Sequence, residues 1–191
     1  MGKLRATIAF RLHCLGTSLG GLYRLAYRLL GMRIGRNTSI GRVYFTWPHQ
    51  VSIGSSCIIE HNVYFHYDGI YKPGPSIVVG DGVFIGAGVE FNVRSMISIG
   101  SRSLIAAGSR FIDHDHNIRG IDSFEPIDGR TGAILIDDDV WIGANTAILR
   151  GVSIGRGSVV GAGSVVTKPI PGNEIWAGVP ARKIGQRSMA P

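Results

Sequence analysis

A six-residue period of aliphatic side chains dominates the second half of this sequence. From residue 136 to residue 166 every sixth residue is isoleucine or valine: Ile136, Ile142, Ile148, Ile154, Val160 and Val166. The following residue is small or short in each case except Leu149. Six residues suffice for one short strand and one corner, and such a unit buries its apolar side chain only by stacking on its neighbours. The period therefore predicts a mainly β fold of stacked parallel coils, with three units in each coil.

The same six-residue period continues towards the N-terminus in several stretches, and extra or missing residues shift its phase from one stretch to the next. Its members are Ile34 and Ile40, then Ile53, Ile59 and Phe65, then Val79, Ile85, Phe91 and Ile97, and finally Ile99, Ile105 and Phe111. Two longer breaks cover Tyr67–Ser76 and an extended loop at about residues 114–135. A long loop that leaves a rigid repeat is a usual place for function.

The N-terminal residues have a different spacing. Apolar residues recur at intervals of three and four in two short runs, Leu4, Ile8, Leu12 and Leu15, and then Leu22, Leu25 and Leu29. This spacing predicts two short helices, separated by glycines at positions 16, 20 and 21. We expect an N-terminal amphipathic helical segment over residues 1–31, followed by the repeat domain and a C-terminal tail over residues 32–191.

The net charge of +7 resides in the N-terminal third. Residues 1–59 hold eight basic residues and no acidic one, whereas residues 60–191 hold twelve basic and thirteen acidic residues, and 12 − 13 = −1. A localised basic patch favours an anionic partner, such as a membrane surface, although the helices could instead pack on the β domain or on a neighbouring subunit. Nothing resembles a nucleic-acid-binding module.

Several features bear on the compartment. No apolar run approaches the roughly 20 residues of a membrane span. The two cysteines, Cys14 and Cys57, make no disulfide framework and read best as small buried residues. We expect a cytoplasmic protein, which could also bind peripherally to the inner face of the membrane.

Three motifs carry a family resemblance: VWIG (Val140–Gly143), GAGSVVTK (Gly161–Lys168) and AGVPAR (Ala177–Arg182). Together with the repeats and the loop after His116 they resemble the hexapeptide-repeat acetyltransferases, and most closely the galactoside, maltose and exopolysaccharide O-acetyltransferases. The resemblance covers residues 33–186. It implies a left-handed parallel β-helix, a homotrimer with active sites between subunits, and acetyl-CoA as co-substrate. No metal is expected.

The segment FIDHDH (Phe111–His116) supplies the candidate base. A neutral imidazole can take the proton of a sugar hydroxyl as the hydroxyl attacks a thioester. The resemblance places the catalytic histidine at His116, with His114 as the alternative. Either Asp113 or Asp115 could orient the imidazole, and the sequence does not distinguish them.

The resemblance assigns acetyl-CoA binding to the late coils. The residues concerned are Gly143, Ala144, Ala162, Thr167, Lys168 and Arg182. The backbone N–H of Ala144 would stabilise the oxyanion, and Lys168 and Arg182 can meet phosphates. Trp141 is equally compatible with a pocket wall and with ordinary packing.

The acceptor site is expected one coil before the histidines, at Glu90, Asn92 and Arg94, polar residues near inward strand positions. The acceptor-binding Asn and Asp of the galactoside and maltose enzymes are replaced by Gly86 and Arg94. We therefore expect another sugar, such as a lipid-linked precursor of a surface polysaccharide. Sugar-stacking faces could come from four aromatic residues, Trp47, Tyr64, Tyr67 and Tyr71.

Three alternatives remain open at this stage. The first is an N-acetyltransferase for an amino sugar nucleotide, which would keep the same fold and donor. The second is a zinc enzyme similar to γ-class carbonic anhydrases, with ligands from His61, His66 and the DHDH segment. The third is a scaffold without catalytic activity.

Overall fold

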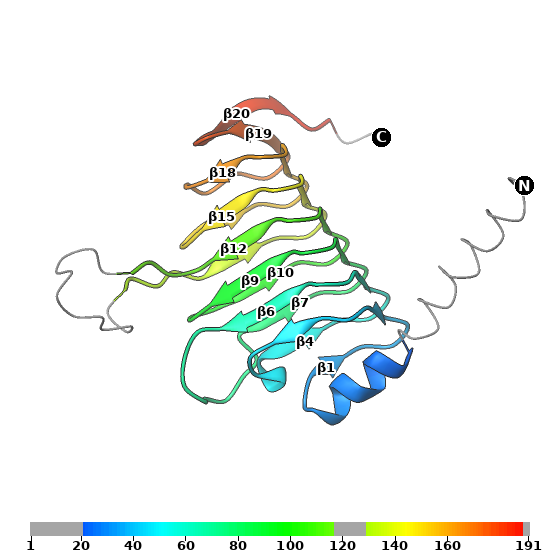
Figure 1. Ribbon diagram of the computed structural model, residues 1–191. Coiled ribbons are helices and arrows are strands. Elements are labelled where there is room, and N and C mark those ends of the chain that lie inside the picture. The colour runs from blue at the N-terminus through cyan, green and yellow to red at the C-terminus, as the bar shows by residue number, and fades with distance from the viewer. Residues whose placement is uncertain (1–20, 117–128, 189–191) are drawn as a thin grey trace, which may run out of the picture.

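The computed structural model describes residues 21–116 and 129–188. Three β-sheets, built mainly of parallel strands, form the sides of a triangular prism (Figure 1). The predicted left-handed parallel β-helix of hexapeptide repeats is confirmed. Sheet A contains β1 (Arg33–Ile34), β4 (Val51–Ile53), β7 (Ile77–Val79), β10 (Ile97–Ile99), β13 (Ile134–Ile136) and β16 (Ser153–Ile154). Sheet B contains β2 (Ser39–Ile40), β5 (Ile58–Ile59), β8 (Phe84–Ile85), β11 (Leu104–Ile105), β14 (Trp141–Ile142), β17 (Val159–Val160), β19 (Glu174–Gly178) and β20 (Ala181–Gln186). Sheet C contains β3 (Tyr44–Phe45), β6 (Tyr64–Tyr67), β9 (Glu90–Val93), β12 (Arg110–Ile112), β15 (Ala147–Leu149) and β18 (Val165–Val166).

The core is a set of side-chain ladders along the prism axis. Sheets A and B contribute the isoleucines and valines of the repeat, such as Ile99 and Ile142, which are buried. Beneath sheet C three phenyl rings stack, with centroids 5.3 Å apart from Phe65 to Phe91 and 5.1 Å apart from Phe91 to Phe111. Parallel in-register pairing places these side chains one above another, so the six-residue period is the period of the core.

The corners explain why small residues follow the aliphatic positions. A Cβ atom added to Gly143 would lie 2.5 Å from the backbone nitrogen of Ala162 in the next coil. At Gly100 it would lie 2.4 Å from the carbonyl carbon of Asp137. Backbones approach too closely there for any side chain.

All extra residues leave the prism at one edge, where sheet C leads into sheet A of the next coil. We call this the C–A edge. The 3₁₀ helix η1 (Pro48–Gln50), the Tyr67–Ser76 break and the long loop between Phe111 and Ile134 all lie there. The slips in the repeat are therefore insertions at a single edge, and the coils on either side stay in register.

The two ends of the prism are closed differently. At the N-terminal end, a helix described over residues 21–29 packs through Tyr27, whose ring lies 5.4 Å from that of Phe45 and whose hydroxyl accepts the N–H of Val43. At the other end β19 and β20 form an antiparallel hairpin. The first predicted helix lies outside the described residues. In the described part of the chain no helix has the length and apolarity to span a bilayer.

Cys57 lies in this core. Its side chain is buried, and burial raises the pKa of the thiol, as expected for a packing residue. Cys14 lies outside the described residues.

Candidate functional site

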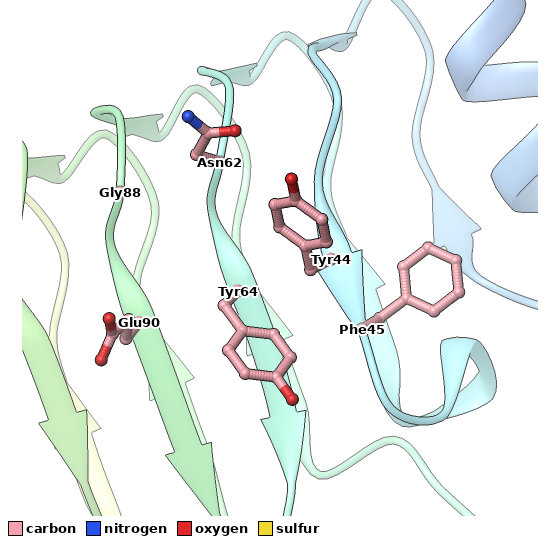
Figure 2. A pocket seen from close by; sticks show the side chains of 6 residues that line it. All are labelled: Tyr44, Phe45, Asn62, Tyr64, Gly88 and Glu90. Atoms are coloured by element: carbon pink, nitrogen blue, oxygen red, sulfur yellow. The ribbon is translucent and has the colours of Figure 1, made fainter.

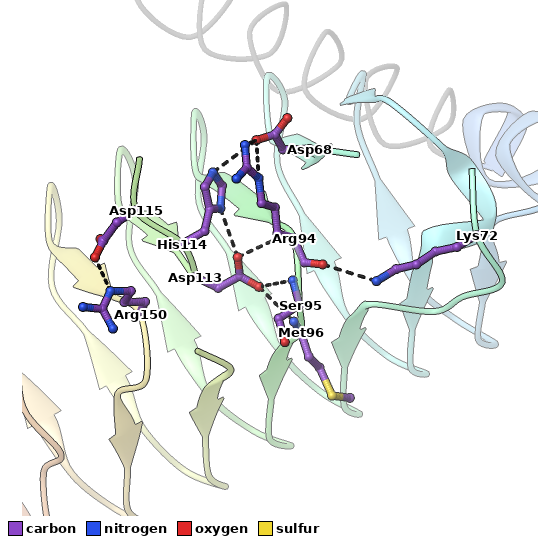
Figure 3. Close-up of polar contacts among 9 residues, drawn as sticks. All are labelled: Asp68, Lys72, Arg94, Ser95, Met96, Asp113, His114, Asp115 and Arg150. Carbon is purple, nitrogen blue, oxygen red and sulfur yellow. Dashed lines mark hydrogen bonds and ion pairs between the residues drawn. The ribbon is translucent and has the colours of Figure 1, made fainter. Parts of the chain in front are cut away.

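Three ionisable side chains follow sheet C in successive coils and meet at the C–A edge (Figure 3). They are Asp68 after β6, Arg94 after β9 and His114 after β12. The Nε and Nη2 atoms of Arg94 lie 2.8 and 2.7 Å from Oδ2 of Asp68. The same oxygen lies 3.3 Å from Nε2 of His114. Each of the three residues follows a stacked phenylalanine at the same interval, and this equal spacing brings together a polar cluster from segments far apart in the sequence.

Asp113 fixes the backbone beneath this cluster. Its carboxylate is fully buried and accepts the backbone N–H groups of Arg94, Ser95 and Met96, each at 2.8 Å. Its Oδ1 atom also lies 3.1 Å from Nδ1 of His114. Asp113 therefore contacts His114, and it ties the start of the histidine segment to the turn between β9 and β10.

The long loop leaves the prism through a short antiparallel neck. His114 pairs with Thr131 in an isolated bridge, the N–H of Asp115 donates to the carbonyl of Arg130 at 2.9 Å, and that of Gly132 donates to Asp113 at 2.8 Å. Side chains alternate along extended chain, so His114 and His116 fall on one side. Their rings lie 5.8 Å apart, edge to face.

The two histidines differ in what surrounds them. His114 is 4% exposed, and each of its ring nitrogens lies beside a carboxylate oxygen. His116 is exposed, and no hydrogen bond reaches its ring nitrogens within residues 21–116 and 129–188. Asp115 pairs with Arg150 and not with His116. Of the two imidazoles, that of His116 is the exposed one.

The residues expected to bind acetyl-CoA fall on two different edges. Ala144 and Ala162 lie in successive coils at the edge between sheets B and C, where the N–H of Gly163 donates to the carbonyl of Ala144 at 2.8 Å. Gly143 adjoins them, and Arg182 lies opposite Ala177 in the hairpin above. Gly143, Ala144 and Ala162 therefore form a column of small residues, with the cationic side chain of Arg182 in the hairpin at its end.

The backbone N–H of Ala144 is the group expected from the sequence to stabilise the oxyanion. At the same corner two coils earlier, the N–H of Ala87 donates to Glu60 at 2.8 Å. The N–H of Ala144 has no such partner among the described residues.

Thr167 and Lys168 lie instead on the C–A edge, two coils beyond the histidines. Both are exposed. Trp141 lies on the outer face of sheet B, half exposed, between Leu104 and Val159. One prism therefore presents the candidate base and the alanine column on edges separated by the width of sheet C.

The residues expected to bind the acceptor lie beside the inward positions of β9, and their role stays a prediction. Phe91 and Val93 point inward, because the phenyl ladder fills the core, so Glu90 and Asn92 point outward. Glu90 pairs with Arg110 at 3.1 Å. Asn92 Oδ1 is buried and has no hydrogen-bond partner among the described residues.

Aromatic side chains lie on the N-terminal half of sheet C and on its insertions. An open groove there is lined by Tyr44, Phe45, Asn62, Tyr64, Gly88 and Glu90 (Figure 2). Of the aromatics expected to stack on sugars, Tyr64 lines this groove. Trp47 lies 5.8 Å from Tyr71 in a separate cluster, and Tyr67 is buried.

No group of three metal-ligating side chains occurs in the described part of the chain. His61 and His66 lie in the second coil, and the Nδ1 atom of His66 lies 2.7 Å from the Tyr64 hydroxyl. The DHDH segment begins two coils further on.

Sequence reasoning missed Asp68 and Arg150. Asp68 contacts His114 across 46 residues of chain, and Arg150 pairs with Asp115. A signal was available for Asp68, since it follows Phe65 at the same interval at which Arg94 follows Phe91 and His114 follows Phe111.

Comparisons with known proteins agree with this architecture. The profile of the bacterial transferase hexapeptide (six repeats) matches residues 133–168, and that of the hexapeptide repeat of succinyl-transferase matches residues 76–109. An acetyltransferase-like protein of Saccharomyces cerevisiae is 33% identical over 137 residues, which cover 72% of this chain and 59% of the yeast protein. The chain thus spans little more than half the length of that relative.

Solved structures extend the likeness. AntD, an N-acyltransferase from Bacillus cereus solved with dTDP-4-amino-4,6-dideoxyglucose and coenzyme A, shares the fold with a TM-score of 0.77 at 23% identity, over 87% of this chain and 90% of that one. Galactoside acetyltransferase in complex with coenzyme A has a TM-score of 0.59 at 26% identity, over 82% of this chain and 65% of that one.

Proposed function

This chain belongs to the hexapeptide-repeat transferases, and we propose that it transfers an acetyl group from acetyl-CoA to a sugar hydroxyl, with His116 as general base. The observation that carries the proposal is the exposed imidazole of His116, which has no hydrogen-bond partner among the described residues and lies on a neck that buried Asp113 and His114 hold in place. A hydroxyl needs a base as it attacks a thioester, and an imidazole without a fixed partner can provide one.

The protein residues divide the reaction between them. His116 accepts the proton as the acceptor oxygen bonds to the acetyl carbon, and returns it to the sulfur when the carbon–sulfur bond breaks. The N–H of Ala144 stabilises the negative oxygen formed in between. The small side chains at Ala144 and Ala162 leave space for the carrier arm, and Lys168 and Arg182 meet its phosphates.

A second subunit completes this site in our proposal, because the base and the alanine column lie on different edges of one prism. The outer face of sheet B supports an assembly of several prisms. It carries an in-register apolar stripe: Ile58, Phe84, Leu104, Trp141 and Val159. Three of these side chains, those of Ile58, Leu104 and Trp141, are about half exposed (53%, 49% and 51%). Contiguous exposed apolar surface of this kind marks protein–protein contacts, and we propose a homotrimer. Light scattering of the protein and of Leu104→Asp tests it: a monomeric wild type contradicts the proposal.

Acylation of an amino sugar nucleotide is the second candidate. The fold likeness to AntD favours it, since AntD was solved with such a compound. An amine is a stronger nucleophile than a hydroxyl, so an amino acceptor would depend less on His116.

An acetyl-CoA thiol-release assay against matched hydroxyl and amino sugars separates these functions. We expect release with hydroxyl acceptors and a product ester that mild alkali cleaves. An alkali-stable amide as the sole product would replace the first candidate by the second. No release with any member of the panel, and no binding of acetyl-CoA, would contradict both.

A further inference from the structure

The helix over residues 21–29 has three distinct sides. Tyr23 and Tyr27 face the end of the prism, where their rings stack 5.9 Å apart and Tyr27 is buried. Four leucines at the other side and end of the helix are largely exposed: Leu22 (65%), Leu25 (58%), Leu29 (80%) and Leu30 (59%). A surface helix needs one apolar stripe to pack on its own domain, so the leucines form a second stripe without a partner in the described residues.

The charge around these leucines has a single sign. Arg24 and Arg28 share the third side of the helix, and Arg33, Arg36 and Arg42 follow within the first coil. All except Arg24, which is partly buried, are exposed, and no acidic residue occurs before Glu60. Leucines beside arginines suit an interface that is apolar within and anionic at its surface, because the arginines can reach the charged layer while the leucines enter the apolar one.

We infer that this helix docks the protein on an anionic membrane surface, with Leu22, Leu25 and Leu29 in the acyl boundary and Arg24 and Arg28 at the headgroups. The charge complementarity selects this occupant. A nucleic acid would leave the leucines without a use. A second copy of this chain would bring two basic ends together, and like charges in contact oppose association.

This inference deepens the proposed function, on which the following step rests. The helix lies at the end of the prism opposite β19 and β20 (Figure 1). His116 follows β12, three coils beyond β3, so at about 4.8 Å per coil this candidate base stands roughly 14 Å along the prism from the docked end. That placement suits an acceptor sugar carried on a membrane lipid and held beyond the headgroups.

Vesicle flotation of the full chain tests the docking. Phosphatidylcholine vesicles with and without phosphatidylglycerol serve as probes, at low and at high salt. We expect binding to the anionic vesicles only, weakened by salt. The double substitution Leu25→Gln with Leu29→Gln should lower binding by at least about tenfold, because it removes two apolar side chains from the docked face. The pair Arg24→Gln with Arg28→Gln should lower it and flatten its salt dependence.

A matched control lies at the other end of the prism. Ile184 is 68% exposed on β20, and Arg156 is exposed as well, so Ile184→Gln with Arg156→Gln removes the same kinds of group elsewhere. Unchanged binding of this control is expected, and an equal loss would overturn the inference. So would full binding by the leucine variant, or a smaller particle size for that variant without vesicles, which would assign the stripe to a second copy.

The assay is independent of the transfer reaction. Turnover of acetyl-CoA with a soluble sugar should be unchanged in the leucine variant. If the wild type binds anionic vesicles but transfers no acetyl group, the docking inference stands and the proposed function fails.

Discussion

The coils from β13 to β18 differ from the coils from β1 to β12 in the corner between sheets C and A and in the side chain that fills the core beneath sheet C. In the later coils the six-residue period runs from Ile136 to Val166 without an added residue. In the earlier coils every turn adds residues, always at the C–A edge. The inward residue of sheet C changes with this difference. In the earlier coils this residue is phenylalanine, at positions 45, 65, 91 and 111, and an insertion follows each one. In the later coils, which have no insertion, it is Ile148 or Val166.

This difference indicates how the prism holds functional side chains while its core stays packed. An insertion opens the C–A corner, and a phenyl ring fills the added volume so that the coil stays packed and in register. The interrupted coils carry Asp68, Arg94 and the two histidines at the C–A edge, and the regular coils carry Ala144 and Ala162 at the edge between sheets B and C. We therefore expect chemistry to depend on the first region and donor binding on the second.

His116→Ala is expected to have the largest effect. Loss of a general base lowers turnover by about 10²- to 10⁴-fold. The substitution is on an exposed side chain, so the unfolding transition should not move. Turnover is measured by thiol release and folding by circular dichroism. Activity within a few-fold of wild type would remove His116 from the mechanism.

Phe91→Ala removes the middle ring of the phenyl ladder. Its ring stacks on both neighbours and is fully buried, so we expect a loss of about 3–5 kcal/mol in the free energy of unfolding. Denaturant titration measures it. An unchanged midpoint would show that the ring does not support the interrupted coils.

Ile148→Phe makes the reciprocal change in the regular region. No insertion widens the coil after β15, so the larger ring has no added volume, and we expect about 1–3 kcal/mol of destabilisation from overpacking. A neutral or stabilising result in the same titration would break the link between phenylalanine and insertions.

The sequence predicted most of the fold because its period is the period of the core. It located both long breaks, and it placed the N-terminal helix that includes Leu25. It placed Glu90 and Asn92 beside the inward Phe91, but it could not show what they bind, because a polar residue on the outer face of a strand can also pair with its neighbour, as Glu90 does with Arg110. It also missed Asp68, since that residue gains its role only when insertions stack on one edge.

Asp68→Asn tests how far the histidine neck depends on that stacking. Asp68 contacts both Arg94 and His114, and the amide would keep the shape while removing the charge. We expect turnover to fall about tenfold with little change in KM for acetyl-CoA, because the residue positions the neck without touching the donor. Asp138→Asn breaks an exposed pair with Arg102 at the corner between sheets A and B, and it should leave turnover unchanged. Equal behaviour of the two variants would contradict a positioning role for Asp68.

Lys168→Gln should have the smallest effect and bears on the regular coils. The side chain is exposed at the corner after β18, so its attraction to a donor phosphate is screened by solvent. We expect KM for acetyl-CoA to rise by about two- to fivefold, with turnover at saturation unchanged, because the interaction is the same in the ground state and in the transition state. The rise should diminish at high salt, since screening already weakens the wild-type contact there. Arg156→Gln is the matched control, because Arg156 is equally exposed but lies at the edge between sheets A and B, away from both proposed halves of the site. A lower turnover at saturation in Lys168→Gln would instead show that the late coils take part in the chemical step, and the division between the two regions would then fail.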